Sequence, residues 1–209
     1  MRRNFVKYSV SMNLPTDEIK KLYYEEGLSA RKVSEHLDTT VWQVIKFMKR
    51  NNMPLRNQAE THRIAYAAAP PSFNVRSALT KRGKNLKIAG LMLYLGEGAK
   101  SGNTADLANS NPLVISLFIK MLRQVYGIDE KRLRVYLYCY ANQNLEDLIE
   151  YWSKVVKIDK SQFTKPYVRR DFLIDKQDKM PYGLIHVRYS DKKLLAKLIE
   201  DINEVFGEI

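Results

Sequence analysis

An acidic residue between two glycines closes the most apolar stretch of the chain. Glu97 stands in Gly96-Glu97-Gly98, directly after residues 86–95, in which nine of ten positions are apolar or glycine. Glycines on both sides let other backbone or a ligand approach the carboxylate closely. Carboxylate oxygens suit Mg²⁺, which keeps several waters and takes phosphate oxygens as further ligands. Lys100 follows the acid closely and could hold such a phosphate.

The stretch that carries Glu97 is expected to be a helix. It has no polar face after Lys87, so it must be buried on all sides. It is shorter than the about 20 apolar residues that span a bilayer. One small sheet covers only one side of a helix, so a second chain must cover the rest. A core helix of an ordinary α/β domain, ended by Gly98, is the alternative.

The segments after this helix alternate between strand and helix patterns. We expect a strand at 103–109, a helix from Pro112 to Gly127 with Ser110 or Asn111 as its cap, and a strand at 132–140. In the second strand apolar residues face one way, and the other face carries Arg132, Arg134, Tyr136, Tyr138 and Tyr140. Interleaved arginines and tyrosines on one sheet surface suit phosphate contact and groove packing.

The C-terminal part repeats this pattern. A helix is expected at 145–156, a basic loop at 165–170, and a polar, mobile segment at 171–181. The last strand, 183–190, turns Ile185, Val187 and Tyr189 to one face and Leu184, His186 and Arg188 to the other. Ser190-Asp191 then caps a leucine-rich final helix.

Three of these segments are similar to LAGLIDADG homing endonucleases. Residues 90–98, Gly-Leu-Met-Leu-Tyr-Leu-Gly-Glu-Gly, resemble the family motif, although Met92 stands where the family has a small residue. Leu-Ala-Asn-Ser-Asn-Pro at 107–112 and Arg-Tyr-Ser-Asp at 188–191 extend the resemblance over about residues 86–206. The resemblance implies an α+β fold with a curved antiparallel sheet, in which each motif helix delivers one carboxylate to a metal-dependent DNA-cleavage site.

The chain holds one copy of the motif, and single-motif members of the family act as homodimers. The resemblance therefore implies a dimer seam along the motif helix, with Gly90, Leu93, Tyr94 and Gly96 in the interface. Both Glu97 side chains would lie near the twofold axis and bind Mg²⁺. Such ions activate water and stabilise the leaving oxygen in phosphodiester hydrolysis. Lys100 would then stabilise the charged phosphorane as the second catalytic residue.

The N-terminal part follows the plan of a helix-turn-helix module. Helices are expected from Leu14 to Gly27, from Ser29 to Leu37, and from Val41 to Pro54, with Val41, Val44, Ile45 and Met48 as the inner face of the third. The segment 26–37 resembles the first half of the bacterial and archaeal helix-turn-helix. In such modules the last helix enters the major groove. Residues nominated for DNA contact are Thr39, Thr40, Trp42, Gln43, Lys46, Lys49 and Arg50, with the Gln43 amide suited to adenine and the basic residues to phosphates.

Charge is distributed unevenly over the 209 residues, whose formal net charge is +12. Residues 1–84 carry 16 lysines and arginines against 7 acids, whereas residues 85–209 carry 19 against 16. This distribution favours double-stranded DNA as the partner over a membrane. Cys139 is the single cysteine, so a reducing, cytoplasmic and nucleoid-associated location is expected.

The expected organisation is a basic lead-in at 1–13 within a helix-turn-helix domain at 1–54, a basic linker at 55–85 and a LAGLIDADG-like domain at 86–209. The linker could hold one helix over about 57–68, and its charge could either follow a phosphate backbone or remain solvated. Three functions are compatible with these features: a sequence-specific Mg²⁺-dependent DNA endonuclease, a non-cutting LAGLIDADG/helix-turn-helix transcription regulator, and a protein-interaction adaptor.

Overall fold

The computed structural model describes residues 14–170 and 180–207. The basic lead-in at 1–13 and nearly all of the polar segment at 171–181 lie outside these residues. The chain divides into two compact units, Met1–Pro70 and Pro71–Ile209. The described residues form eight α-helices and a mixed four-stranded sheet, so the fold class is α+β.

The first unit is helical. It contains α1 (Thr16–Lys20), which continues as a π-helix over Lys21–Glu25, and then α2 (Ala30–His36), α3 (Val41–Arg50) and α4 (Gln58–Ala68). These are the predicted helices, and the residues that pack between the first three are Ile19, Leu22, Tyr23, Val33, Val44, Met48 and Met53. Val41, expected on the inner face of α3, is instead exposed, because it occupies the first position of that helix, at its open end.

One arginine holds the chain after α3 against this helical core. The Arg56 guanidinium donates to the carbonyl oxygens of Gly27 and Leu28 and lies 4.0 Å from the centre of the Tyr23 ring. The backbone N–H of Arg56 also donates to the Tyr23 hydroxyl, at 2.9 Å. Arg56 was expected in a linker whose charge either follows a phosphate backbone or remains solvated. In the structure it instead packs against the helical core of the first unit.

The second unit begins inside the stretch expected to be a linker. The N–H and hydroxyl of Ser72 both donate to Asp191, at 3.0 and 2.5 Å, and Tyr189 donates to the Ser72 carbonyl at 2.5 Å. The N–H groups of Asn74 and Arg76 donate to carbonyls of residues 125–127. These hydrogen bonds hold residues 72–76 against the second unit, and α5 (Lys81–Glu97) starts before residue 86.

The sheet has the strand order β1-β4-β2-β3, formed by β1 (Ala105–Asn109), β4 (Leu184–Tyr189), β2 (Leu133–Tyr140) and β3 (Tyr167–Arg169). β4 is antiparallel to both of its neighbours, but β2 and β3 run parallel. The sheet is thus mixed, where an antiparallel one was expected. The chain passes through α7 (Leu145–Val156) between β2 and β3, and such a helical crossover produces a parallel pair.

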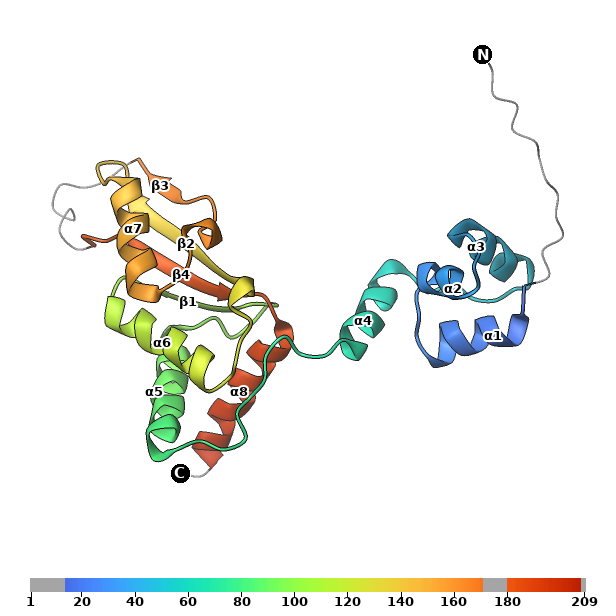
Figure 1. Ribbon diagram of the computed structural model, residues 1–209, viewed down its shortest axis with the longest axis horizontal. Coiled ribbons are helices and arrows are strands. Elements are labelled where there is room, and N and C mark those ends of the chain that lie inside the picture. Colours follow the sequence, from blue (N-terminus) through green and yellow to red (C-terminus); the bar gives the residue numbers. More distant parts are fainter. Residues whose placement is uncertain (1–13, 171–179, 208–209) are drawn as a thin grey trace, which may run out of the picture. The chain divides into compact units, whose positions relative to one another are not determined.

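Helices cover one face of this sheet. Figure 1 shows α5, α6 (Pro112–Gln124) and α8 (Lys192–Gly207) running together below the strands in this view. The strand residues that face them are buried, as the alternation predicted: Leu133, Val135, Leu137 and Cys139 on β2, and Ile185, Val187 and Tyr189 on β4. Asn111 caps α6 by accepting from the N–H of Leu113, at 2.9 Å.

A buried carboxylate ties the helices of the second unit together. Asp201 of α8 is fully buried and lies 3.0 Å from Lys87 of α5 and 2.9 Å from Lys197 of its own helix. It also accepts a hydrogen bond from the Tyr126 hydroxyl, at 2.5 Å. Burial opposes its ionisation, but the hydrogen bonds of Tyr126, Lys197 and Lys87 outweigh that effect and lower the pKa of Asp201 below its usual value.

Among the helices of residues 14–170 and 180–207, none combines the length and the apolar character needed to cross a bilayer.

Candidate nucleic-acid interface

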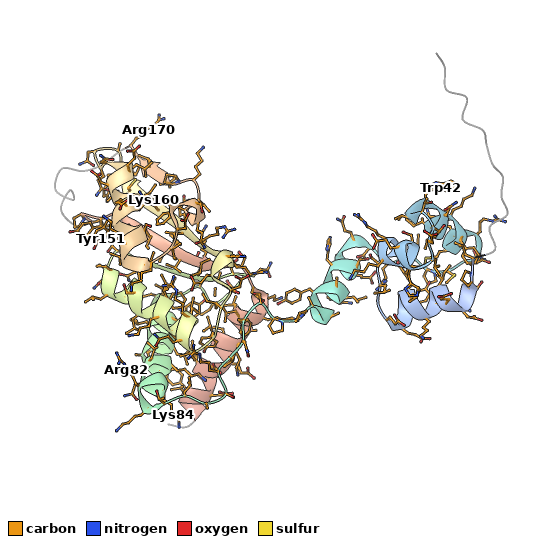
Figure 2. The ribbon with its side chains drawn as sticks, in the orientation of Figure 1. Trp42, Arg82, Lys84, Tyr151, Lys160 and Arg170 are labelled. Carbon is orange, nitrogen blue, oxygen red and sulfur yellow. The ribbon has the colours of Figure 1, made fainter. Side chains whose placement is uncertain are left out.

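The outer face of α3 carries an exposed tryptophan beside a lysine. Trp42 is 66% exposed and extends from the first turn of the helix into solvent, as Figure 2 shows. The Lys46 ammonium lies 4.5 Å from the centre of its indole ring. Lys49 and Arg50 are exposed in the last turn. This face therefore presents a planar apolar group and three cations to any partner.

Three of the polar residues nominated for DNA contact form a helix cap. The Gln43 side-chain oxygen accepts from the Thr40 N–H at 3.0 Å and from the hydroxyls of Thr39 and Thr40 at 2.6 and 2.9 Å. The Thr40 hydroxyl in turn accepts from the N–H of Gln43, which completes a capping box. Pairing with adenine needs this same amide oxygen, so it would require the cap to open.

The uncovered face of the sheet is rich in basic and aromatic side chains. On β2 it presents Arg134, Tyr136 and Tyr138, and on β4 His186 and Arg188. The rings of Tyr138 and Tyr167 stack with centres 5.1 Å apart, which joins β2 to the short edge strand β3. We call this surface the open face. It is the surface that the Arg/Tyr alternation predicted, except that Tyr140 at the end of β2 is buried.

Three charged or titratable side chains meet on the open face. Asp106 of β1 lies 3.0 Å from Nδ1 of His186 through one carboxylate oxygen and accepts from Nε of Arg188, at 2.8 Å, through the other. The Arg188 guanidinium lies 5.0 Å from the centre of the Tyr136 ring. Burial opposes ionisation of Asp106, but His186 and Arg188 hold its pKa below the usual value. Asp106 is therefore a carboxylate at neutral pH.

The two arginines near the start of β2 are partly engaged. Arg132 belongs to the 3₁₀ turn Glu130–Arg132, not to the strand, and its guanidinium donates to the Ser190 carbonyl at 2.6 Å. Arg134 is exposed and donates from one terminal nitrogen to the carbonyls of Lys131 and Leu133, each at 2.7 Å. Arg134 can offer its remaining nitrogens to a ligand, whereas Arg132 anchors the corner between β4 and α8.

Glu97 is the last residue of α5 and is exposed. Within the part of the chain that the structure describes, its carboxylate makes no hydrogen bond or ion pair, including with Lys100. Lys100 instead lines an open groove of about 940 Å³ with α8 residues such as Leu195 and Ile199. Each chain thus offers one unpaired carboxylate at the end of α5. The Asp106 carboxylate on β1 is already paired with His186 and Arg188.

The two sides of α5 differ in what covers them. Gly90 packs so tightly on α6 that a methyl group there would lie 2.3 Å from the Met121 sulfur, and Tyr94 is buried and stacked on Phe118. These two residues face the core, so their assignment to a dimer interface is wrong. Gly96 faces open space, Leu93 is half-buried, and Ile88 is 47% exposed. The helix is therefore not buried all round within one chain.

Two features of the site were not expected from the sequence. The Asp106–His186–Arg188 cluster joins residues on strands 80 residues apart, and only the alternation along β4 shows that His186 and Arg188 share a face. The capping box at the start of α3 was not predicted either, although Thr40 and Gln43 have the spacing of that motif in the sequence. Within the described residues, no group of three or more His, Cys, Asp or Glu side chains could hold a metal ion.

No protein-family model, characterised protein or solved structure matches this chain significantly.

Proposed function

We propose that this protein is a double-stranded DNA-binding protein of the LAGLIDADG type, which acts as a homodimer and hydrolyses phosphodiester bonds with a divalent metal. The observation that carries the proposal is the open face, where arginines and tyrosines alternate on strands that no described helix covers on that side. Guanidinium groups suit phosphate oxygens, and aromatic rings pack against sugars and bases.

The outer face of α3 supplies a second DNA-binding surface in this proposal. Lys46, Lys49 and Arg50 are exposed on one short helix, and they would neutralise backbone phosphates. Trp42 would contact base edges or sugars through its exposed ring. Thr39, Thr40 and Gln43 would position the start of this helix through the cap, instead of reading bases directly.

The exposed side of α5 is the proposed dimer interface. Ile88, Ala89, Leu93 and Gly96 give it an apolar surface with small residues, which allows two helices to approach closely. A twofold axis along this side would bring together one Glu97 from each chain. Leu93 and Gly96 are interface residues in this proposal, as the sequence suggested. Ile88 and Ala89 replace Tyr94 and Gly90 as the other two.

The Glu97 pair is the proposed Mg²⁺ site. Mg²⁺ prefers carboxylate oxygens and retains waters, so one unpaired, exposed carboxylate from each chain fits the ion as two halves of one site. When bound, the metal would lower the pKa of a coordinated water and stabilise the leaving oxygen. The open face would hold the DNA backbone across this site, and Lys100 would have to turn away from the groove beside α8 to assist.

Salt dependence of DNA affinity tests the binding part of the proposal. We expect the full chain to bind random-sequence duplex DNA with an affinity that falls steeply with salt. Replacing Lys46, Lys49 and Arg50 together by glutamine should reduce the slope of log K against log salt by about 3, at about 1 per phosphate contact. Lys20, Lys21 and Lys32, replaced together, are the matched control. An unchanged slope would show that these three residues of α3 do not contact DNA phosphates.

Cleavage is tested separately. Supercoiled plasmid incubated with the protein and Mg²⁺ should be nicked or linearised, and Glu97→Gln should abolish this without changing affinity measured in the absence of metal. Glu130→Gln, an exposed carboxylate on the turn before β2, is the control. Tight, metal-independent binding without cutting of any supplied target would favour the non-cutting regulator instead.

A further inference from the structure

Two basic side chains on the open face share one carboxylate. We propose that His186 and Arg188, oriented by Asp106, form a phosphate-binding site that binds DNA more tightly when His186 is protonated. This inference rests on the proposed function, since the phosphate belongs to the backbone of bound DNA.

The hydrogen bonds to Asp106 determine which nitrogens remain for a ligand. Nδ1 of His186 and Nε of Arg188 both face the carboxylate, at 3.0 and 2.8 Å. The imidazole Nε2 and the terminal guanidinium nitrogens are therefore the atoms that can reach a phosphate. The His186 and Arg188 side chains are 28% and 40% exposed, so both are accessible from the open face.

The site is already arranged before a ligand arrives. Asp106 on β1 is only 19% exposed, and its carboxylate contacts both the His186 imidazole and the Arg188 guanidinium. The Tyr136 ring lies against both, with the Arg188 guanidinium 5.0 Å and the His186 ring centre 5.7 Å from its own centre. These contacts restrict the rotamers of the two side chains, which reduces the entropy lost when a phosphate binds.

Protonation of His186 changes the local net charge from zero to positive. With neutral imidazole, the Asp106 carboxylate and the Arg188 guanidinium cancel. With imidazolium, the cluster carries one net positive charge. The ring of His186 contacts Asp106 on β1 and Tyr136 on β2. Arg188 binds the same Asp106, and Arg134 lies opposite Arg188 on β2.

The register of the strands puts this site beside Glu97. Gly98 pairs with Leu107 in an isolated antiparallel bridge, and Leu107 pairs with Val187 of β4. Gly98 and Val187 are therefore two strand spacings apart, about 10 Å between their Cα atoms. Glu97 and His186 are the residues that precede them in the chain, so we expect one phosphodiester group to reach both the carboxylate and the imidazole. The proposed site would thus bind the phosphate nearest to Glu97.

The direction of the pH effect follows from linkage. A phosphate stabilises the imidazolium, so the complex binds a proton more tightly than the free protein does. DNA affinity must therefore fall as pH rises through the histidine range. We expect affinity to be about fivefold weaker at pH 8 than at pH 5, the effect of one partly exposed charge pair.

Fluorescence anisotropy of a labelled random-sequence duplex, without divalent metal, tests this in the full chain. His186→Gln should remove the pH dependence, so that its affinities at pH 5 and pH 8 become equal. His36→Gln and His62→Gln, which alter the other two histidines of the chain, should keep it. Arg188→Gln should lower the salt slope by about 1 at every pH. A pH dependence that survives in His186→Gln would overturn the proposal.

The NMR signals of the histidine side chains in the unaltered protein test the phosphate site directly. This measurement does not depend on the folding of any variant. Titration with inorganic phosphate, and separately with DNA, should shift the His186 ring signals more than those of His36 and His62. DNA binding with no shift at His186 would refute the phosphate site while the proposed function stands. A response to inorganic phosphate without DNA binding would support the site and refute the proposed function.

Discussion

At the scale of single residues, burial decides what each charged group does. Asp201 is fully buried and contacts Lys87, Lys197 and Tyr126, whereas the neighbouring Glu200 is exposed although it binds the same Lys197. A buried carboxylate that loses its partners is costly, but an exposed pair contributes little. Adjacent positions on α8 therefore differ in their importance for stability.

We expect Asp201→Ala to lower the free energy of unfolding of the second unit by about 2–3 kcal/mol, because the Tyr126 hydroxyl then loses its acceptor in the core. The value lies below that of a fully buried ion pair because both lysines are partly exposed. Glu200→Ala, the matched control, should change it by less than about 0.5 kcal/mol. Urea titration of both variants gives the comparison, and equal losses would contradict it.

The pH dependence of stability follows from the same carboxylate. Its pKa is lowered in the folded protein, so its contribution is present above the unfolded-state pKa of about 3.9 and is lost as pH falls through the lower folded value. The stability difference between the natural chain and Asp201→Asn should therefore be constant from pH 7 to about pH 5 and shrink below about pH 4. A stability difference between the two proteins that grows as pH falls would contradict this prediction.

Sequence patterns could predict which face a residue occupies but not which strands become neighbours. The alternation along β4 and along Leu133–Cys139 of β2 gave both faces correctly, whereas Tyr140, expected on the open face, is buried. The pairing of Asp106 with His186 depends on β4 lying between β1 and β2, and that placement results from packing in the whole second unit. For this reason His186 was not among the predicted site residues.

At the scale of elements, the helices were predicted best because their ends are set locally. Asn111 with Pro112 and Ser29 before α2 are caps that the sequence shows directly. β3 was missed, since its three residues are exposed and have no apolar alternation to reveal them. The parallel pairing of β2 with β3 likewise has no local signal.

Two glycines of α5 should respond oppositely to the same substitution. Gly90→Ala would put a methyl group 2.3 Å from the Met121 sulfur, and we expect it to destabilise the second unit by about 1–3 kcal/mol. Gly96→Ala meets nothing within 4 Å and should stabilise the helix by about 0.5 kcal/mol. Thermal unfolding of both variants measures this. A loss in both would mean that Gly96 also packs against something.

The cap of α3 gives a prediction that separates a structural role of Gln43 from a base-reading one. Gln43→Ala should lower the stability of the first unit by about 1 kcal/mol, because the Thr40 N–H loses its acceptor. Gln43→Glu should keep that stability, since a glutamate at this position accepts the same bond. Circular dichroism during thermal unfolding tests both. Equal stability of all three proteins would exclude the capping role.

At the scale of the whole molecule, the chain has two separate hydrophobic cores, one in each compact unit. We expect two unfolding transitions in urea. Val44→Ala should weaken only the first unit and Val187→Ala only the second, each by about 2 kcal/mol from the lost burial and the cavity left behind. Fluorescence and circular dichroism recorded together distinguish the transitions. A single transition moved by both variants would show that the units unfold as one.

The burial of Cys139 has a practical consequence for testing the assembly. The side chain is 1% exposed, and burial raises the pKa of its thiol, so it should react slowly with labelling reagents. Because the chain has no other cysteine, a cysteine introduced at position 96 would be the one reactive sulfur in each protomer. Mild oxidation would then link two copies covalently if their α5 helices meet, and a gel without reductant would display the result.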